Sequence, residues 1–247
     1  MTPRVAEDRF FGNRILAIDG PAGAGKSTIA ARMAERFGLL NIETGAMYRA
    51  FALKALAAGT ALEDGPALAR LSQHTGIELI PEPGGNRVLL DDVDVTNRLR
   101  TPEVTAAASR VSVHAPVRAW LVGLQQALGA ALPDGARGIV MEGRDIGTVV
   151  FPQASLKIFL FASPEARTER RLAQTTGTAA AAAESISDET KLLAAIRERD
   201  ARDRARAESP LRPADDAVQI DSTALTLDQV IERVAALVLE RWKLSRS

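Results

Sequence analysis

The segment IDGPAGAGKST at residues 18–28 places Lys26, Ser27 and Thr28 behind a run of glycine, alanine and proline. Its spacing matches G-x-x-x-x-G-K-[ST], and it lies between a short apolar run and a stretch of good helix formers, as that motif requires. Backbone N–H groups of such a loop point inward and, with the positive end of the following helix, form a site for phosphate groups. A tight glycine turn that binds nothing is the alternative, and the lysine and serine count against it. The segment therefore predicts binding of a nucleoside triphosphate.

Different residues of this loop are expected to bind different parts of MgATP. Lys26 supplies a positive charge to the β- and γ-phosphates, and the Ser27 hydroxyl ligates the Mg²⁺ ion that bridges them. The loop does not identify the phosphate acceptor, so water, a metabolite and a nucleotide all stay open. The expected ATP-binding residues are Gly20, Pro21, Ala22, Gly23, Ala24, Gly25, Lys26, Ser27 and Thr28.

A phosphate-bearing acceptor needs several cations from separate segments, because they must also screen its repulsion from the triphosphate. Arg49 lies about one turn into a predicted helix that Thr44 is expected to cap. Arg144 and Asp145 directly follow a predicted buried strand, where open α/β sheets bind their ligands. Taken singly, each arginine is more often a solvated surface residue. The candidate cations are Arg49, Arg118, Arg144 and Arg206.

The charged stretch RDARDRAR at residues 199–206 has helical spacing. Arg199, Asp203 and Arg206 are spaced i, i+4 and i+7, which places two cations and a carboxylate on one helical face. By charge pattern alone, a salt-bridged, solvated helix is the better interpretation of this stretch.

Five segments together resemble those of the bacterial cytidylate kinases, P-loop kinases that phosphorylate CMP and dCMP. They occur in the family's order and approximate spacing, and the resemblance covers about residues 14–242. It implies transfer of the γ-phosphoryl group of ATP to CMP or dCMP, with Mg²⁺ as the cofactor and these nucleotides as the partners. The segments are IDGPAGAGKST, ETGAMYR, TPEVTAAASRVSVHAPVR, EGRDIGTVVFP and RERDARDRAR.

The resemblance also implies roles for matching residues. Catalysis falls to Lys26, Arg144 and Arg206. A lid helix carries three further arginines, one or more of which covers the transferring phosphoryl group; these are Arg167, Arg170 and Arg171. The implied CMP-binding residues are Thr44, Arg49, Ser109, Arg118, Arg144, Asp145, Arg199, Asp203 and Arg206.

The chemistry of cytosine fits part of this set. A carboxylate such as Asp145 accepts from the exocyclic amine, and Ser109 and Arg118 complement the rest of the base, whereas uracil would leave the carboxylate unpaired. The chain departs from the family pattern at Glu43–Thr44, where Asp–Ser is usual, and in an alanine-rich stretch at 174–187. That stretch is expected to form a mobile flap, with a disordered surface loop as an equal alternative.

Strands that alternate with helices predict the elements that position these residues. With the resemblance, they predict an α/β P-loop NTPase fold: a doubly wound parallel five-stranded sheet with a lid and an inserted small α+β subdomain that binds the monophosphate. Apolar runs predict strands at 15–18, 138–141, 156–160 and 217–220, and an antiparallel hairpin over 77–90. Helices are expected over 28–37, 46–58, 196–207 and 227–242, and from 102, 115 and 164 onward.

The expected domain organisation is a short extension followed by one kinase domain. The extension spans 1–13 and the kinase domain 14–247. Within the domain, the expected parts are a core at 14–43, 138–165 and 208–247, a monophosphate-binding region with its insert at about 44–132, and a lid at about 166–190.

Composition narrows the function classes. The formal net charge is zero, so no global field favours binding to nucleic acid or a membrane, and no apolar run is long enough to span a bilayer. The absence of cysteine excludes disulfides and thiolate nucleophiles, and it fits a reducing cytoplasm as the expected location. The protein is also expected to be a monomer. Two alternatives stay open. One is a P-loop kinase for UMP, AMP or a sugar acid, and the other is a nucleotide-dependent switch, which would be expected to carry an N-K-x-D motif that the chain lacks.

Overall fold

The structure is a computed structural model that describes residues 14–82, 84–131, 136–175 and 185–243. The expected extension at 1–13 lies outside the described residues, and so does most of the expected flap at 174–187. Across the described ranges, no helix combines the length and apolar character needed to cross a membrane.

The centre of the molecule is a parallel sheet of five strands, which confirms the predicted doubly wound core. Residues of β1 alternate between the two faces, since Leu16 and Ile18 join one buried cluster and Ala17 joins the other. Both faces are therefore apolar, as in a parallel sheet covered on both sides. In spatial order the strands are β2 (Leu40–Glu43), β6 (Ile139–Gly143), β1 (Ile15–Asp19), β7 (Leu156–Phe161) and β8 (Val218–Asp221).

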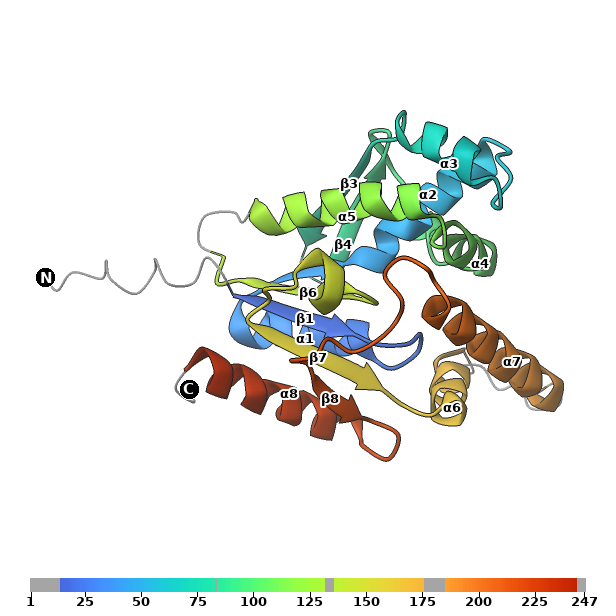
Figure 1. Cartoon of the computed structure of the whole chain (residues 1–247). Coiled ribbons are helices and arrows are strands. Elements are labelled where there is room, and N and C mark those ends of the chain that lie inside the picture. The colour runs from blue at the N-terminus through green and yellow to red at the C-terminus, as the bar shows by residue number, and fades with distance from the viewer. Residues whose placement is uncertain (1–13, 83, 132–135, 176–184, 244–247) are drawn as a thin grey trace, which may run out of the picture.

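Helices cover both faces of this sheet (Figure 1). On one face lie α1 (Lys26–Phe37) and α8 (Leu227–Trp242), whose apolar residues pack against the strands. On the other face lie α2 (Thr44–Ala57) and α5 (Ala115–Ala130), which belong to a second buried cluster. The helices packed on both faces thus hold the sheet in place, and the loops at the carboxyl ends of its strands are held with it.

Between α2 and α5 the chain forms a small insert with its own sheet. The strands of this sheet are antiparallel, which confirms the predicted hairpin; they are β3 (Ile77–Glu82), β4 (Gly85–Leu90) and β5 (Val93–Asp94). The other elements of the insert are α3 (Gly65–Ser72), the 3₁₀ turn η2 (Thr96–Arg98) and α4 (Pro102–Val111).

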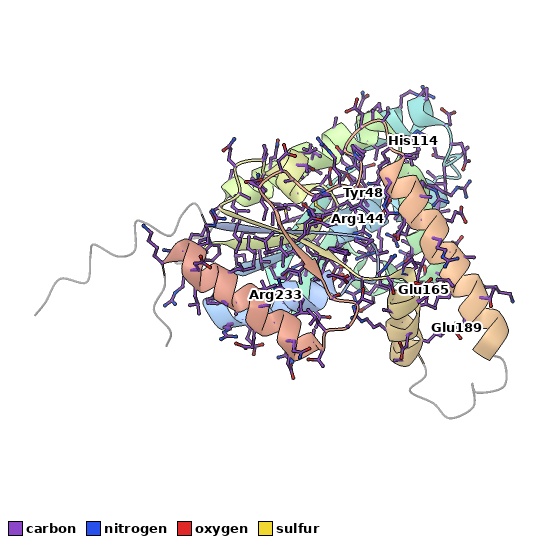
Figure 2. All side chains as sticks on the ribbon, turned by 60° about the horizontal axis from the view of Figure 1, so that its bottom comes forward. Tyr48, His114, Arg144, Glu165, Glu189 and Arg233 are labelled. Carbon is purple, nitrogen blue, oxygen red and sulfur yellow. The ribbon has the colours of Figure 1, made fainter. Side chains whose placement is uncertain are left out.

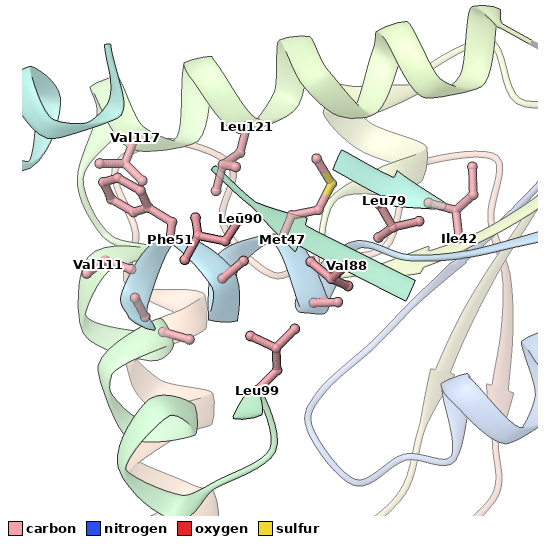
Figure 3. Packing of buried hydrophobic residues seen from close by; sticks show 14 of the residues in the cluster. Ile42, Met47, Phe51, Leu79, Val88, Leu90, Leu99, Val111, Val117 and Leu121 are labelled. Atoms are coloured by element: carbon pink, nitrogen blue, oxygen red, sulfur yellow. The ribbon is translucent and has the colours of Figure 1, made fainter. Parts of the chain in front are cut away.

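The insert shares an apolar core with the main sheet. Phe51 of α2 is fully buried and meets Trp120 of α5 edge to face, with ring centroids 5.3 Å apart. Figure 3 shows Leu79 and Val88 of the insert in the same cluster, which extends to Ile42 of β2. Because one buried cluster joins these elements, apolar burial holds the insert on the sheet.

Two helices lie beyond the carboxyl ends of β1 and β7 (Figure 1). They are α6 (Pro164–Thr175) and α7 (Ser185–Arg204), and they pack against each other. A short π-helical turn, η3 (Ile146–Val150), follows β6. These elements surround the edge of the sheet at which the loops of β1, β2 and β6 meet.

Several elements differ from the sequence prediction. Helix α1 begins at Lys26 rather than at residue 28, because Gly25 adopts a left-handed conformation (φ 94°) that turns the chain directly into the helix. Helix α2 begins at Thr44 rather than at residue 46. The strand β2, the helix α3 and the turn η3 were not predicted.

Helix α7 is longer than predicted at its start and shorter at its end. It spans Ser185–Arg204 rather than 196–207, so Arg206 lies beyond the helix and not on its face. Ser209 takes a positive φ of 51°, and Pro210 has no N–H to continue a helix. The predicted helical face therefore holds for Arg199 and Asp203 and is wrong for Arg206.

Candidate active site at the carboxyl end of the sheet

A cavity of about 890 Å³ lies where the loops after β1, β2 and β6 meet the insert and the helices α6 and α7. Figure 2 shows Tyr48 and Arg144 near each other in the middle of the molecule, and both line this cavity. Gly20 and Pro21 are the predicted site residues that do not line it. Those that do are Ala22, Gly23, Ala24, Gly25, Lys26, Ser27, Thr28, Thr44, Arg49, Ser109, Arg118, Arg144, Asp145, Arg167, Arg170, Arg171, Arg199, Asp203 and Arg206.

The loop between β1 and α1 wraps around its own lysine. Gly20 (φ 149°) packs so tightly that a Cβ there would lie 1.9 Å from the carbonyl oxygen of Leu160, so a larger residue does not fit. Lys26 is 5% exposed, and its Nζ donates to the carbonyl of Pro21 at 2.8 Å. Burial, and then the charge of Arg144, lowers the pKa of Lys26 to about 7. A bound polyphosphate would raise that pKa again, because an opposite charge favours the ammonium form.

Oxygen groups beside the lysine fit a magnesium ion. The Ser27 hydroxyl donates to Glu142 Oε1 at 2.8 Å, and Mg²⁺ takes few protein ligands because it keeps waters and binds phosphate oxygens. Asp19 is already engaged, since it accepts from the N–H groups of Ile146 and Gly147 at 2.8 and 2.7 Å, and burial raises its pKa to about 7. Within the described ranges, no three histidine, cysteine or acidic side chains gather into a metal cluster of their own. Ser27 and Glu142 are therefore the groups suited to hold the ion.

Opposite the loop, buried ion pairs hold the arginines in place. Arg118 of α5 pairs with Asp145, and both side chains are almost fully buried. Asp203 of α7 accepts from Arg144 Nε at 3.0 Å and also pairs with Arg206. Burial favours the neutral acid, but Arg144 and then Arg206 outweigh it and lower the pKa of Asp203. Among the described residues, ten lysine and arginine side chains but four carboxylates line the cavity, so it favours anionic ligands.

Some of these arginines carry buried donors for which the described residues supply no hydrogen-bond partner. Burial, and then the charge of Arg144, lowers the pKa of Arg199 to about 10. Leaving a buried donor unpaired costs about 1–3 kcal/mol, so native structures rarely do so without a reason. An anionic ligand with several acceptor oxygens would satisfy these groups. Within the described part of the chain, the unpartnered buried guanidinium nitrogens are Arg49 Nε, Arg118 Nε, Arg199 Nε, Arg206 Nε and Arg206 Nη1.

The Glu43–Thr44 pair, where the chain departs from the family pattern, serves two contacts. Glu43 occupies the N-cap of α2 and Thr44 does not, so the prediction that Thr44 caps this helix is wrong. The Thr44 hydroxyl instead donates to the carbonyl of Glu142 at 2.8 Å, because β6 lies beside β2. The Glu43 carboxylate pairs with Arg49 and, at 2.9 Å, with Arg100 of the insert. The longer acid thus joins the end of β2 to two cations of the pocket.

The arginines expected on the lid have unequal surroundings. Arg167 is 1% exposed and its guanidinium donates to the carbonyls of Ala162 and Ala22 at 3.0 and 2.9 Å. It also pairs with Asp200 of α7, with Nη2 and Oδ2 2.5 Å apart. Arg167 therefore ties α6 and α7 to the phosphate-binding loop, and its contacts are structural.

Replacing Arg167 with methionine is expected to lower the free energy of unfolding by about 3–5 kcal/mol, because Asp200 would stay buried without its partner. Urea denaturation measures this change. The matched control is Arg197→Met, which removes a pair with Glu165 whose side chains are 60% and 57% exposed; such pairs contribute about 0–1 kcal/mol. Similar small losses in both variants would show that the buried pair is not a structural tie.

The loop from β8 to α8 contributes lining residues that sequence reasoning missed. Arg170 Nη1 donates to Ser222 Oγ at 3.1 Å and so links this loop to α6. Thr226 and Gln229 form a capping box, a signal that marks where the loop ends and not what it faces. In this region the missed residues are Ser222, Leu225 and Thr226 of the loop and Leu227 and Val230 of α8; elsewhere they include Tyr48, Arg100, Ser112 and Glu142.

A doubly wound sheet with a phosphate-binding loop after its first strand, facing a cation-rich second site, defines a P-loop kinase. The sequence matches the model of the cytidylate kinase family over residues 16–240. The chain therefore belongs to the cytidylate kinase family, which confirms the resemblance seen in its motifs.

Similar proteins include cytidylate kinases from several bacteria. The chain is 47% identical to that of Pelotomaculum thermopropionicum over 224 residues, which covers 90% of this chain and 95% of the relative. It is 47% identical to that of Geobacillus kaustophilus over 226 residues, with 92% and 96% covered. It is 43% identical to cytidylate kinase 1 of Haemophilus influenzae over 227 residues, with 91% and 93% covered.

Proposed function

We propose that this protein transfers the γ-phosphoryl group of MgATP to CMP or dCMP, forming ADP and CDP or dCDP. The observation that carries the proposal is one pocket in which a glycine-rich loop faces arginines whose buried guanidinium nitrogens have no partner among the described residues. Two anions that repel each other can meet where cations surround both. Membership of the cytidylate kinase family supports a cytidine monophosphate as the second anion.

The donor half of the pocket is assigned to ATP. The loop residues from Gly20 to Thr28 shape or line the phosphate site, with Lys26 toward the β- and γ-phosphates. Ser27 and Glu142 would hold the Mg²⁺ ion, which when bound neutralises charge on the phosphates. Leu225 and neighbouring residues of the β8–α8 loop offer an apolar surface for the adenine ring.

The acceptor half is assigned to the monophosphate. Thr44, Arg49, Arg144 and Arg206 are assigned to bind its phosphate group. Arg199 and Asp203 are assigned to bind its ribose. Its base is given to Ser109, Arg118 and Asp145. The proximity of Asp145 to Arg118 supports the last assignment, since the pair presents an acceptor and a donor side by side.

Phosphoryl transfer in this pocket requires alignment and charge neutralisation more than acid–base chemistry. The attacking oxygen of the monophosphate is already ionised, so no general base is needed. Lys26, Arg144 and Arg206 stabilise the charge that develops on the transferring group. Closure of α6 and α7 over the nucleotides would exclude water and so prevent hydrolysis of ATP.

We further infer that the domain is divided as the motifs indicate: a core at 14–43, 138–165 and 208–247, a monophosphate-binding region at about 44–132 and a lid at about 166–190. The placement of the insert beside the acceptor half supports this division. A cytoplasmic location and a monomeric state stay predictions.

The decisive experiment compares acceptors in a coupled assay of ADP release. CMP and dCMP are expected to give kcat/KM values at least about 100-fold above those of UMP and AMP, because a site built to hydrogen-bond one base leaves buried groups unpaired with another. A higher value with UMP or AMP would favour the kinase of a different acceptor. Tight triphosphate binding without turnover of any acceptor would favour a nucleotide-dependent switch.

A further inference from the structure

Arg202, a residue of α7 that none of the motifs singles out for the site, does not line the cavity but contacts a residue that does. Its Nη1 donates to Ser109 Oγ on α4 at 2.8 Å. Its Nη2 pairs with Glu198, one turn earlier on its own helix. Ser109 is 5% exposed and lines the cavity, so the two helices meet through this hydrogen bond beside the ligand site.

This contact sets the hydrogen-bonding role of Ser109. A hydroxyl group carries one proton and two lone pairs, and an arginine can only donate. Because Arg202 donates to Oγ, the hydroxyl keeps its own proton for another partner. In the part of the chain that the structure describes, this hydroxyl donates to no protein group. Arg202 thus occupies one of the two lone pairs of Oγ, which favours the orientation in which Ser109 donates to a ligand in the cavity.

A serine held as a donor matters for the choice of base. Along its pairing edge cytosine presents one donor and then two acceptors, whereas uracil presents an acceptor, a donor and an acceptor. Asp145 supplies the acceptor that the cytosine amine needs, and Arg118 and Ser109 supply the two donors. A serine free to rotate would accept from uracil instead, and the discrimination would weaken.

We propose that Arg202 is a positioning residue for base selectivity, which acts by holding the Ser109 hydroxyl as a donor toward cytosine. This inference rests on the proposed function and adds a residue to it. A purely structural role fits Arg202 poorly, since the Arg202 and Glu198 side chains are 30% and 72% exposed and pairs of this kind contribute little to stability.

The test compares kcat/KM for CMP and for UMP in Arg202→Met. The ratio of the two values is expected to fall about tenfold, the effect of one lost hydrogen bond. Since both acceptors are measured on one preparation, partial unfolding would not change the ratio. The matched control is Arg204→Met, which replaces an exposed arginine of the same helix; neither arginine lines the cavity, but only Arg202 of the two is seen to donate to Ser109, so the Arg204→Met ratio should equal that of the unmodified protein.

A double-mutant cycle separates action through Ser109 from an independent effect. Ser109→Ala should lower the ratio, and adding Arg202→Met to it should change the ratio less than twofold further. An unchanged ratio in Arg202→Met, or losses that multiply in the double variant, would overturn the inference. Failure of the proposed function is a different outcome, because the unmodified protein would then show no preference for CMP over UMP.

Discussion

Replacing Lys26 with alanine is expected to lower kcat for phosphoryl transfer to CMP by about 10²–10³-fold. The Lys26 ammonium lies inside the phosphate-binding loop, 2.8 Å from the carbonyl oxygen of Pro21. Because Lys26 is buried, the proposed role gives this preorganised cation a larger effect on the charge of the transferring group than a cation in solution would have. The measurement is kcat from coupled ADP release at saturating ATP and CMP.

A second lysine serves as the control for this variant. Lys54→Ala removes a partly exposed lysine of α2 that pairs with Asp91 of the insert, and it should leave kcat unchanged within about twofold. The thermal unfolding midpoint of Lys26→Ala should not fall, because burial already disfavours the Lys26 charge, as its lowered pKa indicates. Near-normal turnover in Lys26→Ala would place the ATP phosphates elsewhere.

The strands that could be predicted are those whose residues are buried on both faces. In a chain of alternating elements, short apolar runs such as 15–18 and 156–160 are typical of buried parallel strands. The strand β2 was not predicted because Asn41 and Glu43 interrupt its apolar residues. Its pairing with the neighbouring strand β6 makes this segment a strand. The turn η3 depends on hydrogen bonds that the N–H groups of Ile146 and Gly147 donate to Asp19, which is far away in the sequence, so no local pattern reveals it.

The site could be predicted where its signal is local. The phosphate-binding loop carries its whole motif within a few residues, whereas the stretch at 199–206 looks like a solvated helix by charge alone. Tertiary contacts reverse that interpretation, since Asp203 is 1% exposed and lies between two arginines. No local motif marks Ser222 or Leu225 as lining residues, because only the packing of α6 and α8 around the sheet brings them to the cavity.

Replacing Asp145 with asparagine is expected to lower kcat/KM for CMP about 100-fold, while the value for UMP falls much less or rises. The Asp145 carboxylate is a pure acceptor beside Arg118, in a position that is 4% exposed. An asparagine amide can turn its donor toward the pocket, where it repels the cytosine amine and suits the uracil carbonyl. The measurement is the CMP to UMP ratio of kcat/KM.

Two further measurements separate this effect from general damage. The KM for ATP should change less than about threefold, because the proposal assigns Asp145 to the acceptor half. Equal losses for ATP and CMP would contradict that assignment. The free energy of unfolding should fall, since Arg118 would lose a buried anionic partner. The matched control for the KM and for the free energy of unfolding is Asp91→Asn, which replaces an exposed aspartate. A variant that is folded, binds ATP normally and has lost its preference for CMP is the outcome that ties the buried carboxylate to the base. Such a variant would also show that base choice and phosphate transfer rest on separate groups of one pocket.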